Sequence, residues 1–210
     1  RRRPMAKKNA RNTRGKIVEA AWQLFYEQGY EDTTVEEIIE SSHTSKGSFY
    51  HYFDGKDALL STLSDLFDQK YLALQEAMDP AMPAMDKLLF LNRALFRMIE
   101  NSVSMDLLAR LLSTQLVTNG ERHLLDHKRI YYRLLRRIIA EGQAAGQLSQ
   151  GRSVNDMVKV YALCERALLY DWCLCGGEYP LCDYAARQMP HFLCDFLPPP
   201  SSKNGSGENP

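Results

Sequence analysis

Residues 33–60 read TTVEEIIESSHTSKGSFYHYFDGKDALL, and this stretch decides the fold of the chain. Two short segments with apolar residues at helical spacing flank a polar break at residues 41–44. The second segment opens with small and polar residues at 45–48 and continues as an aromatic run at 49–53. This plan is typical of a helix-turn-helix, in which the N-terminal residues of the second helix face base edges in the major groove of DNA.

The first of these two helices has a start signal in the sequence. Thr33 and Thr34 are each followed three residues later by a glutamate, which is the spacing of a capping box. Before them, apolar residues from Ile17 to Phe25 form the stripe of another amphipathic helix, which Gly29 is suited to end. We therefore expect three helices packed as a small trihelical unit, with the third helix at about 45–52.

Helical phase divides the third helix between core and surface. Phe49 and Phe53 are four residues apart and are expected to face the core. The residues at 45–48 are small enough to let the backbone approach DNA, and their hydroxyl and ammonium groups can reach base edges or phosphates. The aromatic residues outside the core are expected to contact the sugar-phosphate backbone, where tyrosine and histidine donate hydrogen bonds that position the protein on the DNA. The residues expected to contact DNA are Thr33, Thr34, Thr44, Ser45, Lys46, Gly47, Ser48, Tyr50, His51, Tyr52 and Lys56.

This region resembles the TetR/AcrR transcriptional regulators. The resemblance is carried by KGSFYHYF at 46–53, by Lys56, and by the residues at 28–30 and 33–35. The turn departs from the family pattern, because His43 and Thr44 stand where the pattern has glycine and valine. A turn glycine usually marks a positive φ angle, which histidine tolerates better than most residues. We expect the turn to be kept with mild strain.

The amino-acid composition indicates the broad class of protein. Hydrophobic residues make up 45% and charged residues 25% of the 210 residues, which are ordinary globular values. No run approaches the roughly 18 apolar residues of a membrane span, and no signal peptide is visible, so we expect a soluble cytoplasmic protein without membrane contact. The formal net charge is zero, yet residues 1–16 are basic without an acid and can add salt-dependent affinity for phosphates. Residues 1–4 are equally consistent with a cloning remnant.

Helical periodicity continues to the C-terminal region and predicts an all-α fold of about nine helices. Asp54 is the expected N-cap of a long fourth helix with a stripe to Leu74, and Pro80 and Pro83 mark the next boundary. Further helices are expected over about 83–101, 105–119, 121–145, 153–175 and 180–197, the last kinked or split by Pro190. The predicted division is a basic flexible arm at 1–11, a helix-turn-helix domain at 12–55, a ligand-binding and dimerisation domain at 56–197, and a disordered tail at 198–210.

The helix at 153–175 is apolar on two faces and must therefore be buried on both, in a core or in an oligomer. The family resemblance implies pairing of the last two long helices in a homodimer. We expect a ligand pocket among the fourth to eighth helices. Polar or aromatic residues on buried stripes are the expected pocket residues. They are Phe67, Asn92, Phe96, Gln115, Tyr131, Tyr161, Glu165 and Trp172. For each polar one, the alternative is a hydrogen bond to a neighbour that only supports the core.

The cysteines at 164, 173, 175, 182 and 194 are odd in number, so a disulfide framework is not expected. We find no nucleophile–base pair, phosphate-binding glycine loop or metal-spaced ligand set, and we expect neither an enzyme nor a cofactor. The resemblance implies a repressor that a small molecule releases from a pseudo-palindromic double-stranded DNA operator. The alternative is a regulator that is switched by thiol oxidation or that needs no ligand.

Overall fold

The computed structural model describes residues 6–117 and 122–199, with side chains from residue 13 onward. These residues are all-helical apart from turns and loops, as the sequence predicts. The elements are α1 (Ala6–Gln28), α2 (Val35–Ser41), α3 (Lys46–Tyr52), α4 (Lys56–Leu60), α5 (Leu63–Ala77), α6 (Ala84–Ser102), α7 (Met105–Val117), η1 (His123–Leu125), α8 (Ile130–Ala144), α9 (Val154–Leu174), α10 (Leu181–Phe192) and η2 (Cys194–Phe196).

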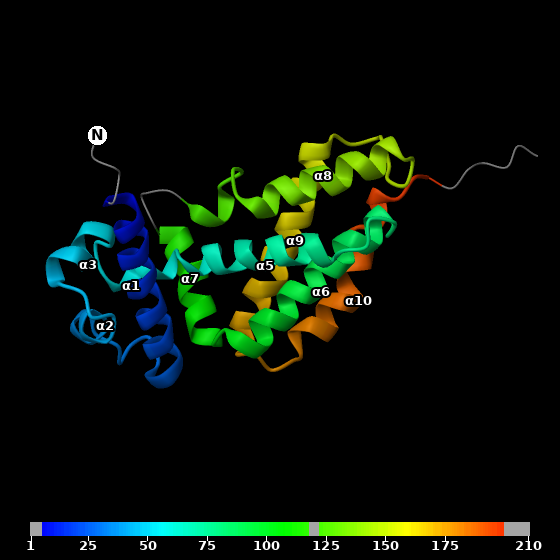
Figure 1. Ribbon diagram of the computed structural model, residues 1–210. Helices are drawn as coiled ribbons and strands as arrows, with labels where there is room; N and C mark the ends of the chain where they lie inside the picture. The colour runs from blue at the N-terminus through cyan, green and yellow to red at the C-terminus, as the bar shows by residue number, and fades with distance from the viewer. Residues whose placement is uncertain (1–5, 118–121, 200–210) are drawn as a thin grey trace, which may run out of the picture.

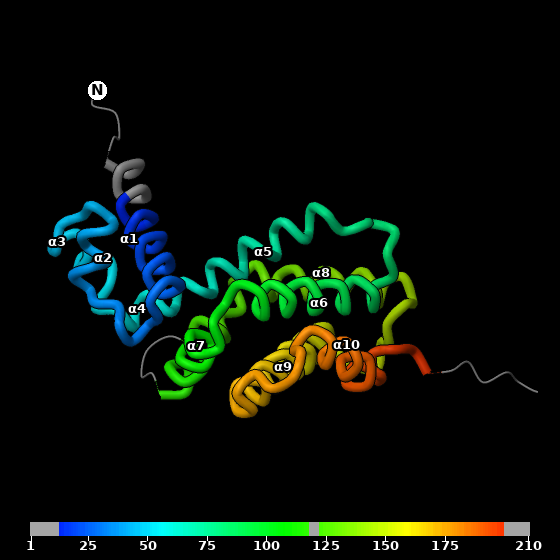
Figure 2. Tube along the Cα trace, turned by 90° about the horizontal axis from the view of Figure 1, so that it is seen from below, coloured from blue at the N-terminus to red at the C-terminus, as the bar shows by residue number. Residues whose placement is uncertain are grey.

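The N-terminal helices form one end of an elongated molecule, and the remaining helices form a bundle at the other end (Figure 1). Helix α1 packs against α2 and α3, and its buried face includes Ile17, Ala21 and Phe25. In the bundle, α6 packs against α10, and α8 contacts α5, α6 and α9. Helix α7 lies between the two ends, where it contacts α4 on one side and α9 on the other (Figure 2).

The first helix is longer than expected. It begins at Ala6, so residues 6–11 of the predicted flexible arm are helical, whereas residues 1–5 lie outside the described residues. Alanine, lysine and arginine are good helix formers, and no proline separates this segment from the apolar stripe. The helix ends where predicted, because Gly29 adopts a φ of 89°.

The expected fourth helix is divided into α4 and α5, and the prediction of one continuous helix is wrong. The hydroxyls of Ser61 and Thr62 donate to the carbonyls of the preceding turn, at 2.7 and 2.6 Å. Side chains of this kind compete with the backbone pattern of a helix. The N-cap of α4 is Gly55 rather than the predicted Asp54.

The expected helix over 121–145 is also wrong in its first third. Residues 118–121 lie outside the described residues, a single 3-10 turn follows at η1, and α8 begins only at Ile130. The carboxylate of Asp68, on α5, accepts a hydrogen bond from the backbone nitrogen of Ile130 at 3.3 Å. This contact from a distant part of the chain sets the start of α8.

Toward the C-terminus, the expected helix at 180–197 is split into α10 and η2 shortly after Pro190, which cannot donate a backbone hydrogen bond.

Candidate nucleic-acid interface and ligand cavity

Helix α3 is anchored to the core by one face and capped by its own first turn. Phe49 is fully buried and Phe53 is 5% exposed, so both occupy the predicted core positions. Ser45 is the N-cap, and its hydroxyl accepts a hydrogen bond from the backbone nitrogen of Ser48 at 3.1 Å. This cap fixes the start of the helix and leaves its first turn at the surface.

The turn before α3 has the conformation that the sequence predicts. His43 has a φ of 51°, which is the left-handed region, and no other non-glycine residue among those described has a positive φ. The backbone nitrogens of His43 and Thr44 donate to Glu40 and Ile39 at 3.0 and 3.1 Å, so the turn closes with its backbone groups paired. The expectation that histidine replaces a turn glycine is confirmed.

Lys46, Gly47, Tyr50 and His51 lie exposed on the outer face of α3. The Lys46 ammonium is 3.5 Å from a carboxylate oxygen of Glu36, and both side chains are largely open to solvent. An ion pair of this kind contributes little, so the ammonium is free to exchange its partner. This face therefore offers one cation, two aromatic donors and a glycine backbone to an approaching molecule.

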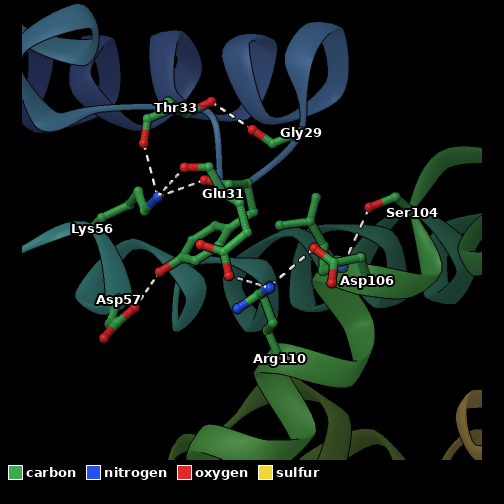
Figure 3. A network of polar contacts seen from close by, with 10 residues as sticks. Gly29, Glu31, Thr33, Lys56, Asp57, Ser104, Asp106 and Arg110 are labelled. Atoms are coloured by element: carbon green, nitrogen blue, oxygen red, sulfur yellow. Dashed lines mark hydrogen bonds and ion pairs between the residues drawn. The ribbon is translucent and has the colours of Figure 1, made fainter.

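Two predicted contact residues, Thr33 and Lys56, make hydrogen bonds within the protein. The Thr33 side chain is buried, and its hydroxyl donates to the carbonyl of Gly29 at 2.7 Å. The ammonium of Lys56 donates to the carbonyls of Tyr30, Glu31 and Thr33 at 2.6, 3.2 and 2.8 Å (Figure 3). An ammonium has three donors, and these three carbonyls occupy them all. Lys56 fastens α4 to the loop after α1, and a phosphate would have to displace these contacts.

Of the remaining predicted contact residues, Thr34 is exposed, whereas Thr44 and Tyr52 are less exposed than the outer face of α3. Thr34 forms the capping box with Glu37, which settles the register that the sequence left open between Thr33 and Thr34. Thr44 is half-buried and shares a hydrogen bond with Ser42 at 2.8 Å, and Tyr52 is half-buried.

A polar network joins this unit to the bundle. The hydroxyl of Tyr30 bonds to Asp57, and burial together with this carboxylate raises the pKa of the tyrosine. Arg110, on α7, forms ion pairs with Glu31 and with Asp106 of its own helix (Figure 3). The same guanidinium lies 5.0 Å from the centre of the Tyr30 ring. Helix α7 is thus attached to the loop that precedes α2.

A cavity of about 50 Å³ lies between α5, α6, α7, α8 and α9. Its lining is mostly leucine and aromatic. The lining residues are Phe67, Tyr71, Leu95, Leu108, Leu111, Leu112, Leu124, Arg129, Tyr131, Ala162, Glu165, Arg166 and Leu169. Three of the predicted pocket residues, Phe67, Tyr131 and Glu165, are among them.

A buried polar cluster built from predicted pocket residues adjoins the cavity and shares Tyr131 and Glu165 with its wall. The Glu165 carboxyl accepts hydrogen bonds from the Asn92 amide at 2.9 Å and from the Tyr131 hydroxyl at 2.7 Å. Tyr161 donates to the carbonyl of Leu88 at 2.9 Å. Burial raises the pKa of Glu165, although these hydrogen bonds oppose the shift. The sequence predicts these polar residues on buried helix faces. In the structure, Asn92, Tyr131 and Glu165 form hydrogen bonds with one another.

The other predicted pocket residues do not line the cavity. Trp172 donates its indole hydrogen to the carbonyl of Tyr179 at 2.9 Å. The amide oxygen of Gln115 accepts from the backbone nitrogen of Leu124 at 3.2 Å, and Gln115 borders a separate surface groove. Phe96 is packed fully into the core.

Three polar lining residues, Tyr71, Arg129 and Arg166, were not predicted. Tyr71 shares the stripe of Phe67 and Leu74, so its phase could have identified it. Arg129 lies just before α8, within the segment expected to be a continuous helix, and no signal in the sequence marks it.

The five cysteines are free thiols. Burial raises the pKa of the Cys164 and Cys173 thiols, which disfavours the reactive thiolate. Among the described residues, no group of three His, Cys, Asp or Glu side chains is placed to hold a metal ion. Nor is any described helix long and apolar enough to cross a membrane.

The capped α3, its exposed first turn and its packing against α1 and α2 define a helix-turn-helix protein. Residues 17–63 match the family model described as "Bacterial regulatory proteins, tetR family". An HTH-type transcriptional regulator of Lactococcus lactis is 43% identical over 58 residues, which is 27% of this chain and 30% of that protein. The repressor KstR2 of Mycolicibacterium smegmatis is 32% identical over 89 residues, or 42% of this chain and 43% of that protein. Residues 17–63 therefore match the tetR family, and the segments matched in the two relatives span less than half of each relative.

Solved structures extend the likeness to the whole fold. The repressor FadR of Thermus thermophilus was solved in complex with lauroyl-CoA and matches this chain with a TM-score of 0.72 at 22% sequence identity. The match covers 88% of this chain and 95% of the FadR chain. FadR of Bacillus subtilis, solved in complex with stearoyl-CoA, matches with a TM-score of 0.66 at 19% sequence identity. This match covers 87% of this chain and 99% of that FadR chain. At these identities the likeness establishes the arrangement of helices.

Proposed function

We propose that the protein is a transcriptional regulator that binds a DNA operator through α3. The single observation that carries this proposal is the outer face of α3, where Lys46, Gly47 and Tyr50 are exposed while Phe49 fixes the helix to the core. Core packing does not require a lysine and a glycine at the start of a capped helix. Major-groove reading does require small residues and hydrogen-bond donors at that position.

The proposed regulator acts as a homodimer. On α9, Leu163, Tyr170 and Leu174 are 56%, 47% and 70% exposed although the opposite face of the helix is buried in the core. Exposed apolar side chains that continue along one helix face favour burial against a partner. A two-fold dimer would present two copies of α3 to a pseudo-palindromic operator, with half-sites about 34 Å apart.

The proposed signal is a small molecule that releases the protein from DNA, which makes the regulator a repressor. Helix α7 supports this mechanism, because Leu108, Leu111 and Leu112 line the cavity while Arg110 contacts the loop before α2. A ligand that fits the cavity better in one position of α7 would favour that position and the corresponding placement of α3.

The test uses DNA fragments selected from the source genome by the purified protein, with affinity measured by fluorescence anisotropy. Lys46→Ala and Tyr50→Ala are expected to lower the affinity for the selected fragment, and the wild-type affinity should fall steeply with salt. Lys128→Ala is the matched control, because it removes the same charge from an exposed loop far along the chain from α3. Wild-type affinity in both α3 variants would refute the proposal.

A further inference from the structure

Two buried polar atoms have no hydrogen-bond partner among the described residues, and both belong to residues that line the cavity. They are the hydroxyl oxygen of Tyr71 and the Nε of Arg129. Buried polar groups in proteins are nearly always paired, so two such atoms at one cavity indicate a missing partner. We propose that the cavity binds the carbonyl oxygen of a neutral, largely apolar molecule, which is the effector of the regulator proposed above.

The donors define the chemistry of this partner. Another nitrogen of the Arg129 guanidinium donates to the Asp68 carboxylate at 2.7 Å and to the Ser64 carbonyl at 3.0 Å, and Nε remains as a donor without an acceptor. The Tyr71 hydroxyl can donate as well. A carbonyl oxygen carries two lone pairs and can accept one hydrogen bond from each of these groups.

The charges at the cavity favour a neutral molecule over an anion. The positive charge of Arg129 is already balanced by Asp68, and the two side chains are only 11% and 16% exposed. An anionic ligand would compete with this buried pair and leave a carboxylate without its partner, which is costly. The other ionisable groups of the wall, Glu165 and Arg166, are opposite in sign and adjacent in sequence on α9.

The size and the walls of the cavity describe the rest of the ligand. About 50 Å³ is several times the roughly 10–15 Å³ that one water molecule needs, and less than the ~150 Å³ of a cavity that holds benzene. Five of the thirteen lining residues are leucines from α6, α7 and α9, at positions 95, 108, 111, 112 and 169. The part of the ligand that enters is therefore a carbonyl with short aliphatic substituents.

The experiment uses 2-butanone, labelled with carbon-13 at the carbonyl, and 2-methyl-1-butene, which has the same skeleton with a CH₂ group in place of the oxygen. Both are titrated into the full chain and into Tyr71→Phe. The carbonyl carbon should move downfield on binding to the wild type, and Tyr71→Phe should weaken ketone binding about tenfold, the effect of one lost hydrogen bond. Tyr179→Phe is the control, because its hydroxyl bonds to Asp171 near the surface, away from the cavity.

The alkene should bind both proteins equally and more weakly than the ketone binds the wild type. Equal ketone binding in wild type and Tyr71→Phe would overturn the proposal, and so would an alkene that binds as tightly as the ketone. A crystal structure in which water bridges Tyr71 and Arg129 and persists in saturating ketone would also overturn it. DNA binding by the ligand-free protein is measured independently, so failure here leaves the α3 proposal standing.

Discussion

The guanidinium of Arg110 lies 5.0 Å from the centre of the Tyr30 ring, across the boundary between the bundle and the helix-turn-helix unit. The ammonium of Lys56 lies 4.3 Å from the same ring. Tyr30 is thus held by a cation from α7 and a cation from α4, and its hydroxyl is held by Asp57. The loop that leads into α2 is fixed by residues that lie 23 and more positions further along the chain.

Removing the Arg110 contact should loosen this loop without unfolding the protein. We expect Arg110→Ala to speed hydrogen exchange of the backbone amides in residues 30–34 and 56–60, because Tyr30 and Glu31 lose a partner. Exchange in α8, which Arg110 does not contact, should not change. Arg152→Ala is the matched control, since Arg152 pairs with Asp156 and Asp195 at the other end of the bundle. Unchanged exchange at residues 30–34 would show that Arg110 does not hold the loop.

The left-handed conformation of His43 makes a prediction about stability. A β-branched residue tolerates this region poorly, so His43→Val should lower the free energy of unfolding by about 1–2 kcal/mol. His43→Gly should not lower it, because glycine adopts a positive φ without steric cost. Denaturant titration measures both variants. A valine variant as stable as the wild type would contradict the assigned turn conformation.

Glu165 makes the stability of the bundle depend on pH. Because burial raises its pKa in the folded state, the folded protein binds its proton more tightly than the unfolded chain does. Its contribution is therefore fully present below the unfolded pKa, about 4.3, and is lost as the pH rises through the folded pKa.

Glu165→Gln keeps the shape of the side chain but does not ionise, and its NH2 group donates where one carboxyl oxygen of Glu165 accepts. The free energy of unfolding of the glutamine variant, relative to the wild type, should rise with pH over this window and then level off. Glu178→Gln, exposed on the loop before α10, is the control for loss of a carboxyl group outside the core. Parallel pH profiles for wild type and Glu165→Gln would contradict the raised pKa.

The helix-turn-helix could be predicted in detail because its signals are local. Helical phase placed Phe49 and Phe53 in the core, and the replacement of a turn glycine by His43 predicted the positive φ that is observed. Lys56 shows the limit of this reasoning. Its position suggested a phosphate contact, but the carbonyls that bind its ammonium lie 23 to 26 residues away and are brought to it only by the fold.

The cavity was harder to predict because it is made by contacts between distant segments. Asn92 and Glu165 were both recognised as polar residues on apolar stripes, yet their hydrogen bond joins positions 73 residues apart. Whether a buried polar group has a partner depends on such pairings. The unpartnered atoms of Tyr71 and Arg129 therefore leave no trace in the sequence.

Gly47→Ala tests the central claim most directly, because it separates folding from DNA binding. A Cβ atom at Gly47 would meet nothing closer than the Ser45 hydroxyl at 3.9 Å, so the folded chain has room for it. Alanine should raise the free energy of unfolding by about 0.5–1 kcal/mol, since glycine is a poor helix former. If the backbone of α3 approaches DNA at this glycine, the added methyl should lower affinity for the selected fragment by about tenfold or more.

The matched control is Gly15→Ala in α1, where an added Cβ also meets open space. It should bring the same gain in stability and keep the DNA affinity. The measurement is the affinity of the purified Gly47→Ala protein for the selected DNA fragment, by fluorescence anisotropy beside wild type and Gly15→Ala. The account predicts a more stable protein that binds DNA at least about tenfold more weakly. A stable Gly47→Ala protein with wild-type DNA affinity would contradict it.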